Sequence, residues 1–319
     1  MRVVITGATG SLGSSIMNRL VESGHEVIGL GRNGNKIEKL KESGFNVLKC
    51  SLENTNEMEQ YFANADCIIH SAAFAAPFGS KNKFIKTNVE GTRTVMQSAL
   101  NMNVNRVIVI SSSSVFEKAN PIDDHSDKLP SQPPSHPYSL SKYRAEEILN
   151  DFPEGMWIGL RPRAVFGNND TTVLPRIKKL INSKRYLVIG NGKTLVDVTC
   201  MSNFLDAVEC AIDADVKATG RVYNISNGKP LETGYMMSKI AQNIHPNAKA
   251  KHIPQFPVKV LSHAINVIGH LSIGLIQPNL TPYSVNQLTK RMVMDLSGAK
   301  KFLGWIPKQS FEEGLEEII

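Results

Sequence analysis

Three glycines spaced three residues apart constrain the fold of this chain more than any other feature. They follow a short apolar run at residues 3–5 and open a stretch over 14–23 that is expected to be a helix ending before Gly24. A glycine turn between a buried strand and a helix lets the backbone approach a pyrophosphate, whose charge the free amides of the helix bind. The turn therefore predicts a dinucleotide site that includes Gly7, Thr9, Gly10, Ser11, Leu12 and Gly13.

The alternation of short apolar runs and helical stretches continues through the first half of the chain. Strands are expected at 3–5, 25–30, 46–50, 67–71, 106–110 and 157–161, and helices over 14–23, 36–42, 57–63, 83–102 and 138–149. Such strands are typical of a parallel sheet covered on both faces. We predict an α/β fold with a doubly wound parallel sheet of six strands, whose ligand lies at the carboxyl ends of the strands.

The second half of the chain loses this rhythm. We expect residues 1–165 to form the cofactor domain with the catalytic residues. Residues 166–319 are expected to form mainly a smaller substrate-binding cap, with some segments returning to the sheet. The apolar stretch 256–276 includes Lys259 and His263, so a lid or a substrate-facing helix is expected there rather than a membrane span, with surface contact to a membrane as a minor alternative.

Composition excludes several classes of function. The chain has 319 residues, 41% of them hydrophobic, which is enough to bury a sizeable core. Its 4 cysteines form no C-x-x-C pair and its 8 histidines no H-E-x-x-H, so no metal site is expected and a reducing, cytoplasmic setting fits best. The net charge of +7 suggests an anionic ligand, but the basic residues look dispersed and no aromatic-interleaved basic run indicates nucleic acid.

The end of the second expected strand bears on the choice of dinucleotide. A site that prefers NAD places Asp or Glu there to hold the ribose 2′-hydroxyl. This chain has Gly31, Arg32 and Asn33 instead, with Lys36 close behind. A guanidinium fits a 2′-phosphate, so NADP is predicted as the preferred cofactor, although a solvated surface arginine is the alternative.

A tyrosine and a lysine four residues apart indicate proton transfer. Tyr138 and Lys142 lie one turn apart on one face of an expected helix. A free tyrosine has a pKa near 10, and a neighbouring ammonium is expected to lower the pKa of Tyr138 enough for acid/base work. Four consecutive serines, 111–114, end the fifth expected strand, where a hydroxyl can hydrogen-bond the reacting oxygen.

Together, the glycine motif, Ser112, Tyr138 and Lys142 resemble the extended short-chain dehydrogenases/reductases over nearly the whole chain. The resemblance implies a catalytic set of Ser112, Tyr138, Lys142 and Asn88, with Ser113 as the alternative serine. It adds cofactor contacts at Ala72, Pro162 and Val165, and a bond from Lys142 to the nicotinamide ribose. Ser51 and Leu52 stand where the family commonly has Asp-Leu beside the adenine, which puts that contact in doubt. By analogy a homodimer is expected, through the helices that begin near Asn88 and Tyr138.

The cap favours one branch of that family. Val196 and Ala164 stand where nucleotide-sugar enzymes tend to carry Arg and Asn, whereas residues 198–207 and 295–305 resemble the 3β-hydroxysteroid dehydrogenase/isomerase-like branch. Phe74 and Phe78 offer apolar surface to a substrate. The resemblance implies an NADP(H)-dependent oxidoreductase that interconverts a ketone and a secondary alcohol. The alternatives are an NAD-dependent nucleotide-sugar epimerase or dehydratase, and a non-catalytic dinucleotide-binding regulator.

Overall fold

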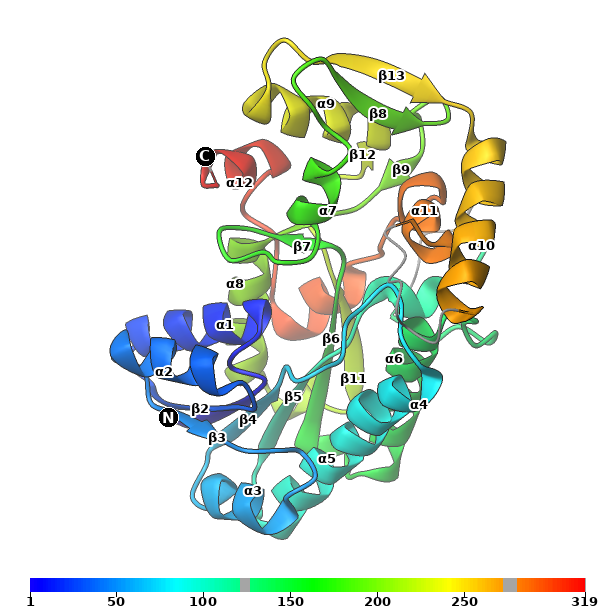
Figure 1. Ribbon diagram of the computed structural model, residues 1–319. Helices are drawn as coiled ribbons and strands as arrows, with labels where there is room; N and C mark the ends of the chain where they lie inside the picture. The colour runs from blue at the N-terminus through cyan, green and yellow to red at the C-terminus, as the bar shows by residue number, and fades with distance from the viewer. Residues whose placement is uncertain (121–126, 272–279, 319) are drawn as a thin grey trace.

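The computed structural model describes residues 1–120, 127–271 and 280–318, and its centre is a seven-stranded sheet (Figure 1). All neighbouring strands are parallel, in the order β11-β6-β5-β4-β1-β2-β3. The strands are β1 (Arg2–Thr6), β2 (Glu26–Gly31), β3 (Val47–Lys49), β4 (Cys67–His70), β5 (Arg106–Ile110), β6 (Trp157–Pro162) and β11 (Arg221–Ile225). The predicted doubly wound sheet is confirmed, and its order reverses between β1 and β4.

Both faces of the sheet are buried, because successive strand residues belong to different apolar clusters. Val3 and Ile5 pack under α1 (Ser11–Glu22), α2 (Gly34–Glu42) and α8 (Met201–Ile212). Val4 packs on the other face with α3 (Thr55–Phe62) and α5 (Gly91–Asn101). This burial explains why the strands are almost uninterrupted apolar runs.

The structure differs from the sequence expectation in two elements near the site. The sheet has a seventh strand, β11, which comes from the second half of the chain and pairs with β6. The helix expected over 83–102 is divided into α4 (Lys81–Phe84), a π-helical segment (Ile85–Glu90) and α5. A π-helical turn inserts an extra residue, which re-aims the side chains beside it, and Asn88 lies in this turn.

The cap above the sheet has its own apolar cluster. The two-stranded ladder of β8 (Arg185–Ile189) and β13 (Lys249–Ile253) covers α9 (Thr233–Ile244), and α7 (Leu174–Lys178) and α12 (Phe311–Glu316) complete the cluster. Two shorter ladders join β7 (Val165–Phe166) to β10 (Thr199–Cys200) and β9 (Leu195–Val196) to β12 (Leu231–Glu232). The division of the chain near residue 165 stays a prediction.

The remaining helices and helical turns complete the two layers. They are α6 (Pro137–Glu147), α10 (Gln255–Leu271), α11 (Pro282–Thr289), the 3-10 turns 113–116, 148–151, 154–156 and 216–218, and a π-helical turn over 299–303. Within the described ranges, no helix is both long enough and apolar enough to cross a bilayer. Residues 272–276 of the apolar stretch lie outside the described residues.

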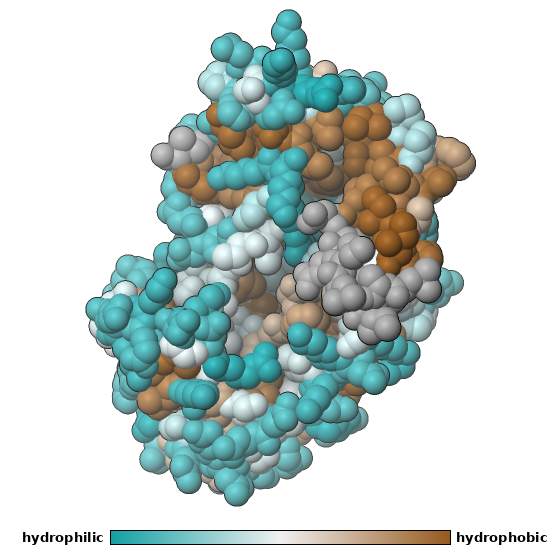
Figure 2. Space-filling model, in the orientation of Figure 1, coloured by the Kyte–Doolittle hydropathy of each residue, from teal (hydrophilic) through white to brown (hydrophobic). Residues whose placement is uncertain are grey.

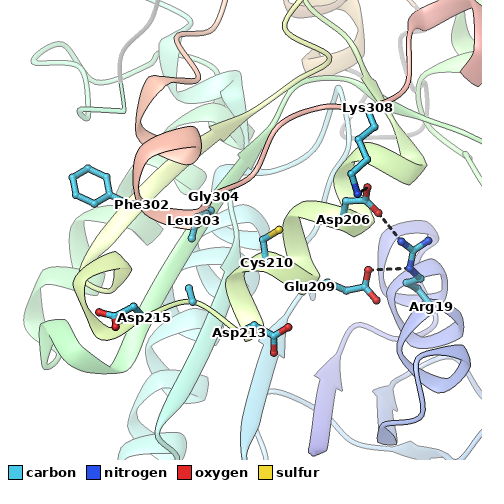
Figure 3. A pocket seen from close by; sticks show the side chains of 11 residues that line it. Arg19, Asp206, Glu209, Cys210, Asp213, Asp215, Phe302, Leu303, Gly304 and Lys308 are labelled. Carbon is cyan, nitrogen blue, oxygen red and sulfur yellow. Dashed lines mark hydrogen bonds and ion pairs between the residues drawn. The ribbon is translucent and has the colours of Figure 1, made fainter.

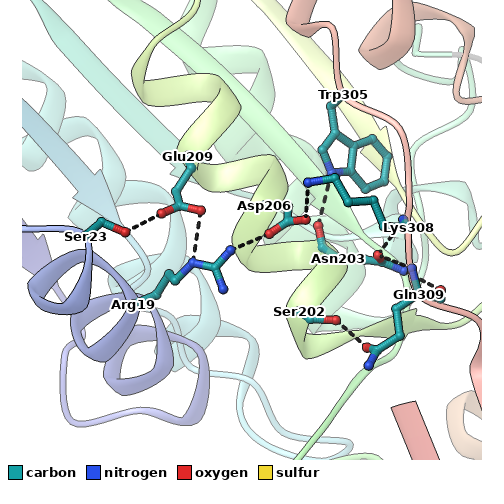
Figure 4. A network of polar contacts seen from close by, with 9 residues as sticks. All are labelled: Arg19, Ser23, Ser202, Asn203, Asp206, Glu209, Trp305, Lys308 and Gln309. Atoms are coloured by element: carbon teal, nitrogen blue, oxygen red, sulfur yellow. Dashed lines mark hydrogen bonds and ion pairs between the residues drawn. The ribbon is translucent and has the colours of Figure 1, made fainter. Parts of the chain in front are cut away.

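A polar network fastens the C-terminal segment to the sheet domain (Figure 4). Arg19 of α1 pairs with Asp206 at 2.6 Å and with Glu209 at 3.0 Å, both on α8. Lys308 reaches the second oxygen of Asp206 at 3.1 Å. The amide oxygen of Asn203 accepts the backbone N–H groups of residues 308 and 309. The network therefore holds α1, α8 and the approach to α12 together.

Candidate active site

The glycine turn has the shape that the sequence predicts. Gly7 has φ of 76°, and a Cβ on it would lie 2.6 Å from the backbone of Ala72 after β4. A Cβ on Gly13 would lie 2.3 Å from the carbonyl oxygen of Gly7. α1 therefore begins directly against the turn, with Gly10 as its N-cap and no acidic residue in its first turn. The turn and helix together form a cradle that fits the pyrophosphate of a dinucleotide.

Exposed basic groups lie beside this cradle. Arg32 follows β2 and is exposed, with no hydrogen bond or ion pair to another described residue. The ammonium of Lys36 donates to the carbonyl oxygen of Thr9 at 3.3 Å, while Asn33 caps α2 by accepting the N–H of Lys36 at 3.1 Å. Both cations are therefore positioned at the end of β2, where the adenine ribose of a bound dinucleotide would lie.

The predicted adenine residues have contacts within the protein. The hydroxyl of Ser51 accepts the N–H of Glu53 at 3.3 Å, and the side chain of Leu52 packs against Gly91 of α5. Their role at the adenine stays a prediction.

The serines of the run 111–114 differ in their contacts. Ser112 hydrogen-bonds to Tyr138 and accepts the N–H of Ser114 at 3.2 Å. Ser111 donates to the carboxylate of Glu146, and Ser113 is buried. Of the two serines that the sequence left open, the structure places Ser112 beside Tyr138.

The surroundings of Tyr138 differ from the sequence expectation. Burial raises the pKa of Tyr138, while the hydrogen bond from Ser112 and the positive charge of Arg176 oppose that rise. Lys142 is not among the groups that lower the pKa of Tyr138, and its ammonium donates to the carbonyl oxygen of Ile110 at 2.7 Å. Burial also lowers the pKa of Lys142 to about 8.

Beneath Lys142 lies a buried ion pair. Glu146, one turn further along α6, binds the guanidinium of Arg161 through bonds of 2.8 Å and 2.5 Å. Both side chains are almost inaccessible to solvent. A buried, bidentate pair holds its two elements in one geometry, so it fixes α6, and with it Tyr138 and Lys142, against β6.

Asn88 connects the loop after β4 to the helix of Tyr138. Its amide oxygen accepts the N–H of Phe74 at 2.7 Å, and its Nδ2 donates to the carbonyl oxygen of Phe74 at 3.1 Å. The same Nδ2 donates to the hydroxyl of Ser141 at 2.8 Å, and that hydroxyl donates to the carbonyl oxygen of Tyr138 at 2.7 Å. Asn88 is fully buried, so in the structure it positions the backbone of Tyr138.

An aromatic cluster of Phe74, Phe84, His136, Tyr138 and Tyr283 surrounds the proposed reacting group. The ring of Phe84 lies 6.1 Å from that of Tyr138 and 4.7 Å from that of Phe74. Tyr283 of α11 stacks on His136 at 4.2 Å and meets Tyr138 edge-on at 6.4 Å. Phe78 is half-buried in the same loop as Phe74. The sequence analysis missed Phe84, His136 and Tyr283, of which only His136 had a local signal, its nearness to Tyr138.

The residues expected beside the nicotinamide end β6 and begin β7. Pro162 is the last residue of β6 and Val165 the first of β7. Between them Ala164 has φ of 44°, a left-handed conformation that alanine rarely adopts. The side chain of Arg163 binds Gln287 of α11, which ties this turn to the helix that carries Tyr283.

A separate surface hollow does not have the chemistry of this site (Figure 3). It is lined by side chains of α1, α8 and the segment before α12, among them Asp206, Glu209, Asp213 and Asp215. Two of these carboxylates are already paired with Arg19. In the part of the chain that the structure describes, no three His, Cys, Asp or Glu side chains gather to hold a metal ion.

Comparison with known proteins yields a family match and relatives of similar length. Residues 3–226 match the NAD dependent epimerase/dehydratase family. The chain is 26% identical to a 2-alkyl-3-oxoalkanoate reductase of Stenotrophomonas maltophilia, over 100% of this chain and 98% of that protein. It is 24% identical to the mouse sterol-4-alpha-carboxylate 3-dehydrogenase, decarboxylating, over 100% of this chain and 90% of the relative.

Solved structures show the same fold. The crystal structure of UDP-glucuronic acid 4-epimerase from Bacillus cereus in complex with NAD has a TM-score of 0.75 to this chain, at 20% identity, over 99% of this chain and 97% of the other.

Proposed function

The chain belongs to the NAD-dependent epimerase/dehydratase family and is an NAD(P)-dependent oxidoreductase; on that premise we propose that it interconverts a ketone and a secondary alcohol. We propose NADP(H) as the preferred cofactor and a small substrate that is hydrophobic or weakly polar. The observation that carries the proposal is that Ser112 lies beside Tyr138 and opposes the rise in its pKa, within a cluster of aromatic rings.

The cofactor would be held by residues at the carboxyl ends of the strands. Gly7, Gly10 and Gly13 would take the pyrophosphate, and Arg32 with Lys36 the 2′-phosphate. A Cβ at Gly7 or Gly13 would meet backbone, so this part of the cradle requires glycine. Bound there, the nicotinamide supplies or accepts the hydride.

The proton chemistry belongs to the protein. In the direction of reduction, the hydroxyls of Ser112 and Tyr138 donate hydrogen bonds to the carbonyl oxygen of the substrate. Tyr138 then gives its proton to that oxygen as the carbonyl becomes an alcohol, and in the reverse direction it takes the proton back. Asn88 positions the backbone of Tyr138, and Lys142, whose ammonium binds the carbonyl oxygen of Ile110, would also bond the nicotinamide ribose. The aromatic cluster excludes water and receives the apolar part of the substrate.

Replacing Tyr138 by Phe tests the role of the phenol. The variant keeps the ring and its packing but loses the proton, so turnover of a ketone with NADPH should fall at least about 100-fold. Binding of NADPH, followed by its fluorescence, should be nearly unchanged. The matched control is Tyr143→Phe on the same helix, which removes only a hydroxyl that donates to the carbonyl oxygen of Pro130. Wild-type turnover in Tyr138→Phe would refute the proposal.

Replacing Arg32 by Ala tests the choice of cofactor. The affinity for NADPH should fall far more than the affinity for NADH, because only NADPH carries the 2′-phosphate. Lys39→Ala, another exposed cation on α2, serves as the control and should affect both alike. Equal losses of NADPH and NADH affinity in Arg32→Ala would contradict the role of the guanidinium.

The alternative of a nucleotide-sugar enzyme has less support, because the position where such enzymes tend to carry an arginine for the diphosphate is a valine here. Val196 is buried in the apolar cluster of the cap, so it offers no cation to a diphosphate. Purification of the protein with tightly bound NAD and no net redox turnover would favour an epimerase. The homodimer stays a prediction.

A further inference from the structure

Helix α10 (Gln255–Leu271) presents its apolar side chains to solvent. Of its large apolar residues, Phe256 is 77% exposed, Val267 56%, Leu261 54%, Val260 53% and Ile268 53%. Because a helix advances about 100° per residue, these five residues form one continuous face. Figure 2 shows the apolar side chains gathered over α10 at the edge of the cap.

The inward face of α10 is the more polar one. Ser262 is buried against the protein, and Gln255 and Asn266 are partly buried on the same side, together with the apolar Val258 and Ile265. A helix that packs on a globular core places its apolar residues inward and its polar residues outward. α10 departs from this pattern, because these five large apolar residues face solvent. The sequence expectation of a lid or a substrate-facing helix stays a prediction.

The positive charge of the protein is concentrated in the same part of the chain. Residues 171–196 and 233–294 contain twelve lysines and arginines and no aspartate or glutamate. The rest of the chain therefore holds 24 of the 36 basic residues and all 29 acidic ones, which gives it a net charge of −5 against +12 for these two stretches. The excess charge was expected to be dispersed, whereas the expected cap, residues 166–319, has 18 basic and 12 acidic residues and so a net charge of +6.

Several of these cations lie on α10 or on the ladder that precedes it in the chain. Strand β13 leads directly into the helix, and its Lys249 and Lys251 are exposed, as are Lys184 and Arg185 next to them in the β8–β13 ladder. Lys259 is exposed on α10 itself. None of these five side chains forms an ion pair with another residue of the described ranges.

We propose that α10 lies flat on the surface of an anionic lipid bilayer, with its apolar face among the acyl chains and the β8–β13 lysines against the lipid headgroups. An exposed apolar helix face with Lys259 on the same helix and a cationic ladder before it, and with no carboxylate nearby in the sequence, fits both the acyl chains and the anionic headgroups of such a bilayer. A second copy of this chain would bring twelve further positive charges against the same region, so a bilayer is the better occupant.

The position of α10 connects this surface to the active site. α10 packs on α11 (Figure 1), and α11 carries Tyr283, whose ring contacts His136 and Tyr138. A bilayer under α10 would place acyl-chain solutes one helix away from the aromatic cluster.

Sedimentation with vesicles tests the proposal without any turnover. The wild type should bind vesicles that contain phosphatidylglycerol, and bind phosphatidylcholine vesicles much more weakly. Phe256→Ser/Leu261→Ser should weaken binding to the anionic vesicles at least about tenfold, because apolar insertion is lost. Lys249→Gln/Lys251→Gln should weaken it by about 30-fold, with little effect on phosphatidylcholine, since each surface cation contributes about 1 kcal/mol only with anionic lipid.

Matched controls lie outside the cap helix. Val216→Ser removes an apolar side chain that is 66% exposed, and Lys39→Gln/Lys217→Gln removes two exposed cations from other elements. These variants should bind the anionic vesicles as the wild type does, and urea unfolding confirms that all variants are folded. If Phe256→Ser/Leu261→Ser were poorly folded, Val260→Ser/Ile268→Ser takes its place.

Three results would overturn the proposal. The first is no binding of the wild type to phosphatidylglycerol vesicles at low salt, and the second is equal binding by the α10 variants. The third is a wild type that binds no vesicles and is a dimer by light scattering, while the α10 variants are monomers. The apolar face of α10 would then be a subunit interface.

Discussion

Gly13 offers the sharpest test of how the glycine turn supports a cofactor. A Cβ added there would lie 2.3 Å from the carbonyl oxygen of Gly7, 2.8 Å from its carbonyl carbon and 3.0 Å from the Cα of Ala8. Ordinary contact for a Cβ begins near 3.4 Å, so the first of these distances is about 1.1 Å too short. All three neighbours are backbone atoms, which cannot rotate away as a side chain can.

The size of this steric clash determines how much Gly13→Ala should reduce stability and NADPH affinity. Overpacking a tight site costs about 1–3 kcal/mol, and the rigid surroundings place Gly13→Ala near the upper value. A turn that moves by about 1 Å also loses amide hydrogen bonds to the phosphates. Each charge-assisted bond contributes about 1.5–3 kcal/mol, which corresponds to a tenfold to hundredfold loss of NADPH affinity.

Two further glycines separate stability from binding. At Gly10 the nearest neighbour of a new Cβ is the oxygen of Gly7 at 3.2 Å, so Gly10→Ala should barely change stability while its methyl group obstructs the pyrophosphate. At Gly155 nothing lies within 4 Å, so Gly155→Ala should change neither property. Urea unfolding measures the stability and NADPH fluorescence titration the affinity. If Gly13→Ala unfolds at the wild-type urea concentration and binds NADPH as tightly, the argument fails.

Two other predictions concern the turn after β6 and the buried lysine. Ala164→Gly should raise the free energy of unfolding by about 0.5–1 kcal/mol, because glycine accepts the φ of 44° at this position without strain, and a loss of stability would contradict this. The pKa of Lys142 is about 8 in the folded protein and 10.5 in the unfolded chain. Between pH 8 and 10.5 the unfolded chain therefore binds more protons than the folded protein, so this lysine's contribution to the free energy of unfolding rises with pH. The wild type should therefore become more stable relative to Lys142→Met from pH 8 to 10.5 in urea titrations; a constant difference would show that the lysine titrates normally.

The parts of the fold that were predictable are those with local causes. The strand from residue 2 to 6, its glycine turn and α1 follow one another directly, so their periodicity and turn chemistry were sufficient. β11 was missed because it comes late in the chain and pairs with β6 only after cap segments have intervened. The direction in which α10 faces was not readable either, since the periodicity of a stretch so rich in apolar residues does not say which side packs on α11.

The residues of the candidate site also fall into those with a local sequence signal and those that depend on tertiary contacts. The position of Tyr138 and Lys142 one turn apart on α6 follows from helical spacing. The choice of Ser112 from four serines depends on how each backbone position turns after β5. Tyr283 is distant in the chain and comes to Tyr138 only through the fold. The bond from Lys142 to the carbonyl oxygen of Ile110 is a tertiary contact too, so the sequence argument about the pKa of Tyr138 lacked it.

The late strand β11 also bears on the order in which the protein forms during synthesis. Every residue of β6 is buried, with β5 on one side and β11 on the other. Until residues 221–225 emerge from the ribosome, one edge of β6 has unpaired backbone groups, which is the kind of edge that pairs with other chains. The nascent N-terminal half is therefore aggregation-prone until the chain has passed residue 225. A fragment that ends near residue 165 would keep that open edge permanently, so it would have the glycine turn, Ser112, Tyr138 and Lys142 on a sheet that is incomplete.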